Sequence, residues 1–222
     1  MNDELKLFID NFTPKEKEAL KFASRIHDGT YRKGPKKEEY IWHPIRVAYL
    51  VDKYKDSKAK EDLICASLLH DTIEDTIGIK LDVHNDIIEQ FGIQVGSLVK
   101  ELTTEEGIKK LLGKTTYLSL KLITMTNYAL VIKLCDRLDN ISDLDNVDEA
   151  FKKRYIDETK KILYSLLTTR NENFVTDTHL TIINDIYNRI YQYEGKNFFI
   201  DNGKVDINHP LVKKLLKQKT IN

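Results

Sequence analysis

Two histidines and two aspartates stand at the ends or in the middle of apolar helical segments, and together they could hold a metal ion. His43 stands alone, His70 and Asp71 are adjacent, and Asp136 lies in a later segment. Two imidazoles with two carboxylates suit a divalent ion that keeps room for water, but ligand type alone leaves Mn²⁺, Fe²⁺ and Zn²⁺ open. A single histidine at a helix end would more often be a cap or a solvated side chain.

A second pair of acids follows the His-Asp pair directly. If helical geometry continues, Glu74 lies four residues after His70 and Asp75 four residues after Asp71, so both acids project on the side of the candidate ligands. If a metal ion binds to the candidate ligands, a carboxylate that activates water would be needed on this side. The alternative is a solvated acidic helix end, although the helix dipole disfavours acids at a carboxy terminus unless a cation is near.

A polar stripe runs along the segment from 129 to 142. Lys133, Asp136, Arg137 and Asn140 fall at positions i, i+3, i+4 and i+7, and the rest of the segment is apolar. Such a helix should be central. Because buried charges need partners, the stripe either lines a cleft, which we favour, or forms a buried ion network.

Composition limits the class of protein. The 222 residues fit one large domain or two small ones, and 35 basic residues balance 35 acidic ones, so no global field favours nucleic acid or an anionic membrane. Cys65 and Cys135 lie in apolar helical runs, which indicates buried thiols and no disulfide framework. The polar amino terminus and the absence of an apolar run of roughly 20 residues predict a cytoplasmic protein.

The spacing of apolar residues predicts an all-α fold with one main domain over 1–195 and a tail over 196–222. In the tail, Asn202-Gly203 between apolar-rich runs predicts a β-hairpin. Residues 29–40 are predicted to form a basic loop. Helices are expected at about 14–27, 44–54, 58–70, 82–91, 93–102, 114–126, 129–142, 148–169 and 176–193.

Several ordered motifs resemble the hydrolase domain of the RelA/SpoT alarmone enzymes over roughly residues 15 to 170. The long members carry a synthetase domain for which this chain has no room, so we expect similarity to the small stand-alone hydrolases and an HD-domain helical bundle. The motifs are His27, Arg32-Lys33, Tyr40-Ile-Trp-His-Pro44, Leu68-Leu-His-Asp-Thr-Ile-Glu-Asp-Thr76, Phe91-Gly92 and Lys133-Leu-Cys-Asp-Arg-Leu-Asp-Asn140.

The resemblance implies a role for each matching residue. The family removes the 3′-pyrophosphate of ppGpp and pppGpp, usually with manganese, and leaves GDP or GTP. The implied metal ligands are His43, His70, Asp71 and Asp136, the implied water-activating acids are Glu74 and Asp75, and the implied nucleotide contacts are Arg32, Lys33, Asn140 and Tyr155, with Lys114 as a further phosphate contact.

Three departures from the family pattern bear on substrate preference. Asp139 stands where many members have His or Tyr, Cys135 where alanine is common, and the basic loop adds Lys36 and Lys37, which either meet phosphates or are solvated. The remaining histidines match no motif and are interpreted as surface or tail residues: His84, His179 and His209.

Two other functions stay open. An HD phosphohydrolase acting on another nucleotide, such as the 2′-phosphate of NADPH, would use the same cleft and metal. A non-catalytic nucleotide sensor should have lost a metal ligand or one of the two acids, and all six residues are present.

Overall fold

The computed structural model describes residues 3–32, 37–195, 200–201 and 204–219, and the predicted all-α class is confirmed. Two short 3₁₀ turns, η1 (Leu144–Asn146) and η2 (Glu172–Phe174), and two short strands, β1 (Ile200–Asp201) and β2 (Lys204–Val205), accompany the helices. The α-helices are α1 (Asp3–Asp10), α2 (Pro14–Ile26), α3 (Trp42–Tyr54), α4 (Lys60–Leu69), α5 (Thr72–Asp75), α6 (Lys80–Phe91), α7 (Ile93–Leu102), α8 (Glu106–Leu112), α9 (Lys114–Thr124), α10 (Asn127–Ser142), α11 (Glu149–Thr169), α12 (Asp177–Tyr193) and α13 (Pro210–Lys219).

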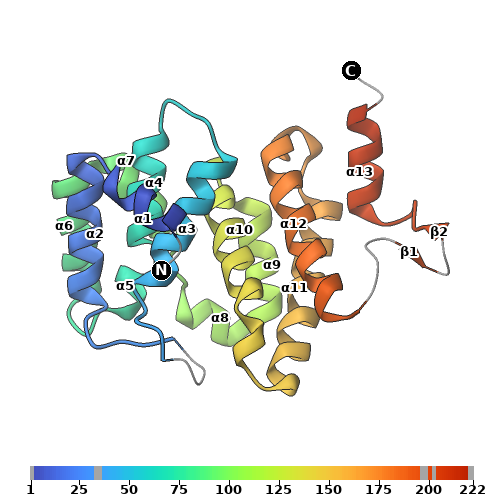
Figure 1. Ribbon diagram of the computed structural model, residues 1–222, viewed down its shortest axis with the longest axis horizontal. Helices are drawn as coiled ribbons and strands as arrows, with labels where there is room; N and C mark the ends of the chain where they lie inside the picture. Colours follow the sequence, from blue (N-terminus) through green and yellow to red (C-terminus); the bar gives the residue numbers. More distant parts are fainter. Residues whose placement is uncertain (1–2, 33–36, 196–199, 202–203, 220–222) are drawn as a thin grey trace.

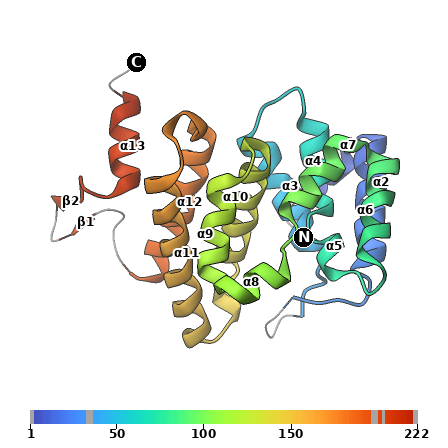
Figure 2. The ribbon, with the colours of Figure 1, turned by 180° about the vertical axis from the view of Figure 1, so that it is seen from behind.

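The helices are packed side by side along the long axis of the molecule, although not in the order of the chain. Helices α2 and α6 lie at one end and α13 at the other, with α10 between them (Figures 1 and 2). Helix α10 packs against α3, α4, α7, α11 and α12, and most of its residues are buried, so the prediction that this helix is central is confirmed. Cys65 and Cys135 are buried in the core, also as predicted.

Local signals explain where the main helices begin. Thr13 and Glu16 form a capping box at the start of α2, with Pro14 in the first turn. The Thr126 side chain accepts a hydrogen bond from the backbone of Ala129 at the start of α10. No helix in the described ranges is long and apolar enough to cross a membrane.

The tail contains a helix that the sequence analysis did not predict. Leu211 and Val212 of α13 are buried, and this helix packs against α11 and α12. Strands β1 and β2 pair antiparallel, with Ile200 opposite Val205. The expected turn at Asn202-Gly203 lies outside the described residues, so the hairpin stays a prediction, and a domain boundary at residue 195 stays a proposal.

His179 was interpreted as a surface residue, and that interpretation was wrong. Its side chain is fully buried, its Nδ1 accepts from the backbone of Thr176, and its Nε2 lies 3.1 Å from the carbonyl oxygen of Asn127. Arg170 also contacts Asn127, through a 2.9 Å bond to its side-chain oxygen. Both residues therefore fix the first turn of α10, which carries Asp136 further along.

The burial of His179 should make stability depend on pH. Burial lowers the pKa of His179 from 6.5 to about 4, so the unfolded chain takes up a proton in this range before the folded chain does. The contribution is present above pH 6.5 and is lost as the pH falls towards 4, by about 2 kcal/mol between pH 7 and pH 5. Urea unfolding at the two pH values should show a smaller loss in His179→Asn. An equal loss in both proteins would contradict the assignment.

Candidate metal centre and substrate cleft

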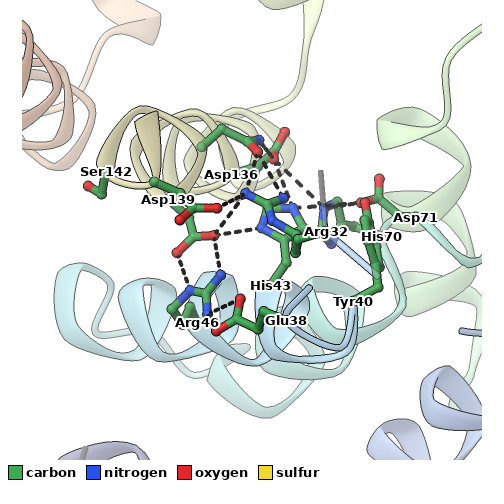
Figure 3. Close-up of polar contacts among 12 residues, drawn as sticks. Arg32, Glu38, Tyr40, His43, Arg46, His70, Asp71, Asp136, Asp139 and Ser142 are labelled. Atoms are coloured by element: carbon green, nitrogen blue, oxygen red, sulfur yellow. Dashed lines mark hydrogen bonds and ion pairs between the residues drawn. The ribbon is translucent and has the colours of Figure 1, made fainter. Parts of the chain in front are cut away.

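Three helical segments bring the four predicted ligands together. His43 lies in the first turn of α3, His70 and Asp71 lie between α4 and α5, and Asp136 lies on α10. Oδ1 of Asp136 lies 3.2 Å from Nε2 of His43 and 4.0 Å from Nε2 of His70. Oδ2 of Asp71 lies 3.0 Å from Nε2 of His70 and 3.7 Å from Nε2 of His43 (Figure 3).

Both imidazole rings turn the same nitrogen towards this cluster. Nδ1 of His70 lies 2.8 Å from the carbonyl oxygen of Ser67, and Nδ1 of His43 lies 2.7 Å from Oδ2 of Asp139. The proton therefore sits on Nδ1 when a metal is bound, and Nε2 offers its lone pair. Nε2 of His70 is buried and lies within 3.0 Å of Oδ2 of Asp71, but within the described part of the chain it has no partner in hydrogen-bonding geometry. Two such nitrogens facing two carboxylates fit a divalent cation.

Charge within the cluster is strongly coupled. Burial opposes protonation of His43, but the carboxylates of Asp136 and Asp139 outweigh it and raise the pKa of His43 to about 9. Burial likewise opposes the charge on Asp136, while Lys133 and the two histidines hold the pKa of this carboxyl well below its usual range. Without a cation the His43 imidazole keeps its additional proton near neutral pH, so metal binding there must release that proton.

The polar stripe of α10 divides between a buried network and a cleft. Nζ of Lys133 lies 2.8 Å from Oδ2 of Asp136, and Arg137 lies 3.4 Å from Glu158. Asn140 donates to Oδ1 of Asp136 at 2.6 Å and also lines a cavity. Helix α10 therefore contributes both to a buried ion network and to the lining of a cavity, the two alternatives considered for the stripe.

Glu74 and Asp75 lie on the short helix α5, one turn beyond the ligands. The helix is interrupted at His70 and Asp71 between α4 and α5, and the two acids contact different neighbours. Oε1 of Glu74 accepts from the backbone of Thr104 at 2.6 Å, and Oδ2 of Asp75 lies 3.5 Å from Nδ1 of His27. Burial and the charges of Asp71 and Glu74 raise the pKa of Asp75 to about 6.

A cavity of about 260 Å³ lies near the predicted metal ligands, and two of its lining residues, Tyr40 and Asn140, bond to them. Both terminal nitrogens of Arg32 donate to Oδ1 of Asn140 at 3.1 Å. The hydroxyl of Tyr40 donates to Oδ2 of Asp71 at 2.6 Å and so joins the cavity to a ligand. The lining residues are Tyr31, Arg32, Tyr40, Asn140, Asp143, Leu144, Val147, Phe151 and Tyr155.

The other predicted substrate contacts are Tyr155, Lys114 and Lys33, and only the first two lie within the described residues. Tyr155 stacks on Phe151, with a centroid distance of 6.0 Å, and the guanidinium of Arg137 lies over its ring at 5.0 Å. Nζ of Lys114 lies 5.6 Å from the centre of the same ring and 3.0 Å from a carboxylate oxygen of Glu158. Lys33 and Lys36 lie outside the described residues, whereas Lys37 is described and exposed.

Sequence reasoning missed two residues at this centre. Asp139, noted only as a departure from the family pattern, bonds to His43, and Arg46 bonds to Asp139 through its Nε at 2.7 Å. The available signals were their spacings: Arg46 follows His43 by three residues on α3, and Asp139 follows Asp136 by three residues on α10.

A helical core with paired histidines and aspartates at its centre defines an HD-type protein. The chain belongs to the HD domain family, whose profile matches residues 19–173. The predicted resemblance to ppGpp 3′-pyrophosphohydrolases is confirmed by its relatives.

The relatives differ in length. The human guanosine-3′,5′-bis(diphosphate) 3′-pyrophosphohydrolase MESH1 is 36% identical over 129 residues, which is 58% of this chain and 68% of the relative. The enzyme of that activity from Aquifex aeolicus is 33% identical over 174 residues, which is 73% of this chain but only 23% of the longer relative. A solved structure described as a metazoan ortholog of SpoT that hydrolyzes ppGpp matches with a TM-score of 0.64 and 26% identity, covering 82% of this chain and 97% of the other.

Proposed function

We propose that this chain hydrolyses ppGpp and pppGpp to GDP or GTP and pyrophosphate with a divalent metal ion, manganese by preference. The observation that carries the proposal is the convergence of the four predicted metal ligands near a cavity lined by Arg32 and aromatic rings. The names of the relatives support it. In the reaction, the oxygen of water bonds to the phosphorus carried by the ribose 3′ oxygen. The bond between this phosphorus and the ribose 3′ oxygen breaks, and the 3′ oxygen takes up a proton.

The protein's own side chains would handle the proton and the phosphate charge. A divalent ion held by His43, His70, Asp71 and Asp136 would supply Lewis-acid activation of water and phosphate. Glu74 and Asp75 would orient the water and accept its proton, and a pKa of about 6 suits Asp75 to this role near neutral pH. Arg32 and Lys33 would offset the charge of the pyrophosphate.

The cavity offers a place for the nucleoside. Tyr155 and Phe151 contribute two stacked rings to its lining, and Arg32 bonds to Asn140, which in turn bonds to Asp136. A purine base stacks favourably on aromatic rings, while a guanidinium favours phosphate oxygens. We therefore infer that the base occupies the aromatic side and that the 3′-pyrophosphate passes Arg32 towards the cluster.

Product analysis tests the proposal directly. Purified protein with Mn²⁺ receives ppGpp, pppGpp and NADPH in parallel, with Mg²⁺, Zn²⁺ and a chelator as comparisons. Release of pyrophosphate together with GDP or GTP is the expected result. Orthophosphate from NADPH with intact ppGpp would instead assign the chain to another nucleotide. Binding of ppGpp without any product would indicate a sensor.

Arg32→Lys should lower ppGpp turnover at least tenfold, which is about 1.4 kcal/mol at the transition state. The guanidinium can hold two phosphate oxygens at once, whereas the lysine ammonium is a point charge. Steady-state kinetics at saturating Mn²⁺ measure the effect, with metal content and folding unchanged. Lys36→Ala in the same loop is the matched control and should do much less. An essential Lys36 with a dispensable Arg32 would place the nucleotide elsewhere.

A further inference from the structure

A chain of charged contacts lies behind His43, on the side away from the metal cluster. Oδ2 of Asp139 lies 2.7 Å from Nδ1 of His43, and Oδ1 of the same carboxylate accepts from Nε of Arg46 at 2.7 Å. NH1 of Arg46 reaches both oxygens of Glu38 at 2.9 Å (Figure 3). The sequence of contacts therefore runs from His43 through Asp139 and Arg46 to Glu38.

The geometry separates Asp139 from the ligands themselves. Asp136 and Asp71 approach Nε2 of His43, at 3.2 Å and 3.7 Å, whereas Asp139 approaches Nδ1. The imidazole ring thus stands between Asp139 and the cluster. Asp139 can act on a metal ion through the ring, but its bonded oxygen is not directed at the cluster.

The two histidines are supported in different ways. His70 donates its Nδ1 proton to a neutral backbone carbonyl of Ser67, and this neutral acceptor suffices to fix the ring. His43 instead faces a carboxylate that is 5% exposed. Because burying an unpaired carboxylate is unfavourable, the bonds from Arg46 help to keep Asp139 charged in this position.

A charged acceptor has a chemical effect that a carbonyl lacks. A carboxylate on Nδ1–H fixes the tautomer whose Nε2 lone pair faces the metal, and its negative charge makes that nitrogen a stronger donor. Arg46 holds the second oxygen of Asp139, and Glu38 holds Arg46 in turn. The effect on the metal should therefore decline along the series Asp139, Arg46, Glu38.

We propose that Asp139 is a positioning residue that strengthens metal binding through His43, with Arg46 and Glu38 holding it in place. The inference rests on the metal site of the proposed function. In this proposal, Asp139 affects the affinity for the metal rather than the chemical step. Residues in such outer positions typically contribute 10- to 100-fold to metal affinity.

Competition with a chromophoric chelator tests the proposal by measuring the Mn²⁺ dissociation constants of the intact chain and its variants. Asp139→Asn keeps the shape of the side chain but removes its charge, and its affinity should fall by about 10- to 100-fold. Glu38→Gln should cause a smaller loss. Asp62→Asn is the matched control, because Asp62 on α4 is a partly buried acid paired with Lys15 on α2. The Mn²⁺ affinity of this variant should equal that of the wild type.

A second readout separates positioning from a general structural defect. Raising the Mn²⁺ concentration should restore most of the turnover of Asp139→Asn, whereas it should not rescue Asp136→Ala, which lacks a ligand. An affinity of Asp139→Asn within twofold of the wild type would overturn the inference and leave the proposed function intact. If Asp139→Asn does not fold, a folded Glu38→Gln protein with wild-type affinity overturns it. A wild-type chain that binds no Mn²⁺ overturns the proposed metal site as well.

Discussion

Replacement of Asp136 by alanine should abolish hydrolysis and weaken Mn²⁺ binding by more than about 100-fold, the upper figure for residues outside the ligand set. Asp136 approaches Nε2 of both His43 and His70, so its loss opens one side of the cluster. The measurements are chelator competition and product release. Mn²⁺ at 100 times its dissociation constant should stabilise the wild type by about 2.7 kcal/mol and leave Asp136→Ala almost unchanged.

Folding of this variant needs its own control, because Asp136 is the partner of the buried Lys133. Asp136→Asn keeps the size of the side chain, and His70→Ala removes a different ligand without leaving Lys133 unpaired. All three variants should lose metal and turnover while keeping the helical circular dichroism spectrum. Near-normal turnover in a folded Asp136→Ala protein would refute the assignment of the ligands.

Replacement of Glu74 by glutamine should lower turnover by roughly 100-fold or more, the loss typical of a missing general base. The glutamine side chain keeps an oxygen that can accept the 2.6 Å bond from the backbone of Thr104, so the local structure should survive. Metal affinity should stay near that of the wild type. Single-turnover kinetics with bound Mn²⁺ would separate this loss from a change in substrate binding.

Asp75→Asn is the informative companion to Glu74→Gln. Asp75 lies beside His27 and has a raised pKa, whereas Glu74 is anchored to Thr104, so the two acids are not equivalent. The variant with the larger loss identifies the main proton acceptor. Unchanged turnover in both variants would mean that the acids are only a solvated helix end.

Local signals marked three of the four predicted ligands, and the structure brings all four close together. His70 and Asp71 directly follow an apolar helix, and Asp136 lies in a polar stripe on a segment that is apolar elsewhere, so burying those segments brings the ligands to the core. The helix ranges were predictable for the same reason, since apolar spacing and capping residues such as Thr13 are local properties of the chain.

The contacts that the sequence did not predict depend on tertiary packing. Which nitrogen of His43 meets Asp139 depends on how α3 and α10 are rotated against each other, and no local pattern specifies that rotation. The sequence pattern predicts a surface position for His179, because its burial depends on a tertiary contact with the Asn127 carbonyl oxygen. Helix α13 does have a local signal, because Pro210 precedes the closely spaced apolar residues Leu211, Val212, Leu215 and Leu216.

Arg32 already has anionic and polar partners before any nucleotide arrives. Its guanidinium holds Asn140 at 3.1 Å and Asp143 at 3.3 Å, so its orientation is set within the fold. In the proposed reaction, phosphate binding at this residue would therefore be an exchange of partners, in which the incoming oxygens must outcompete the Asp143 carboxylate. A weakly charged ligand would gain little binding energy from this exchange, whereas the highly charged pyrophosphate group would gain much more. After cleavage, Asp143 would again bind the guanidinium, which would favour release of the products.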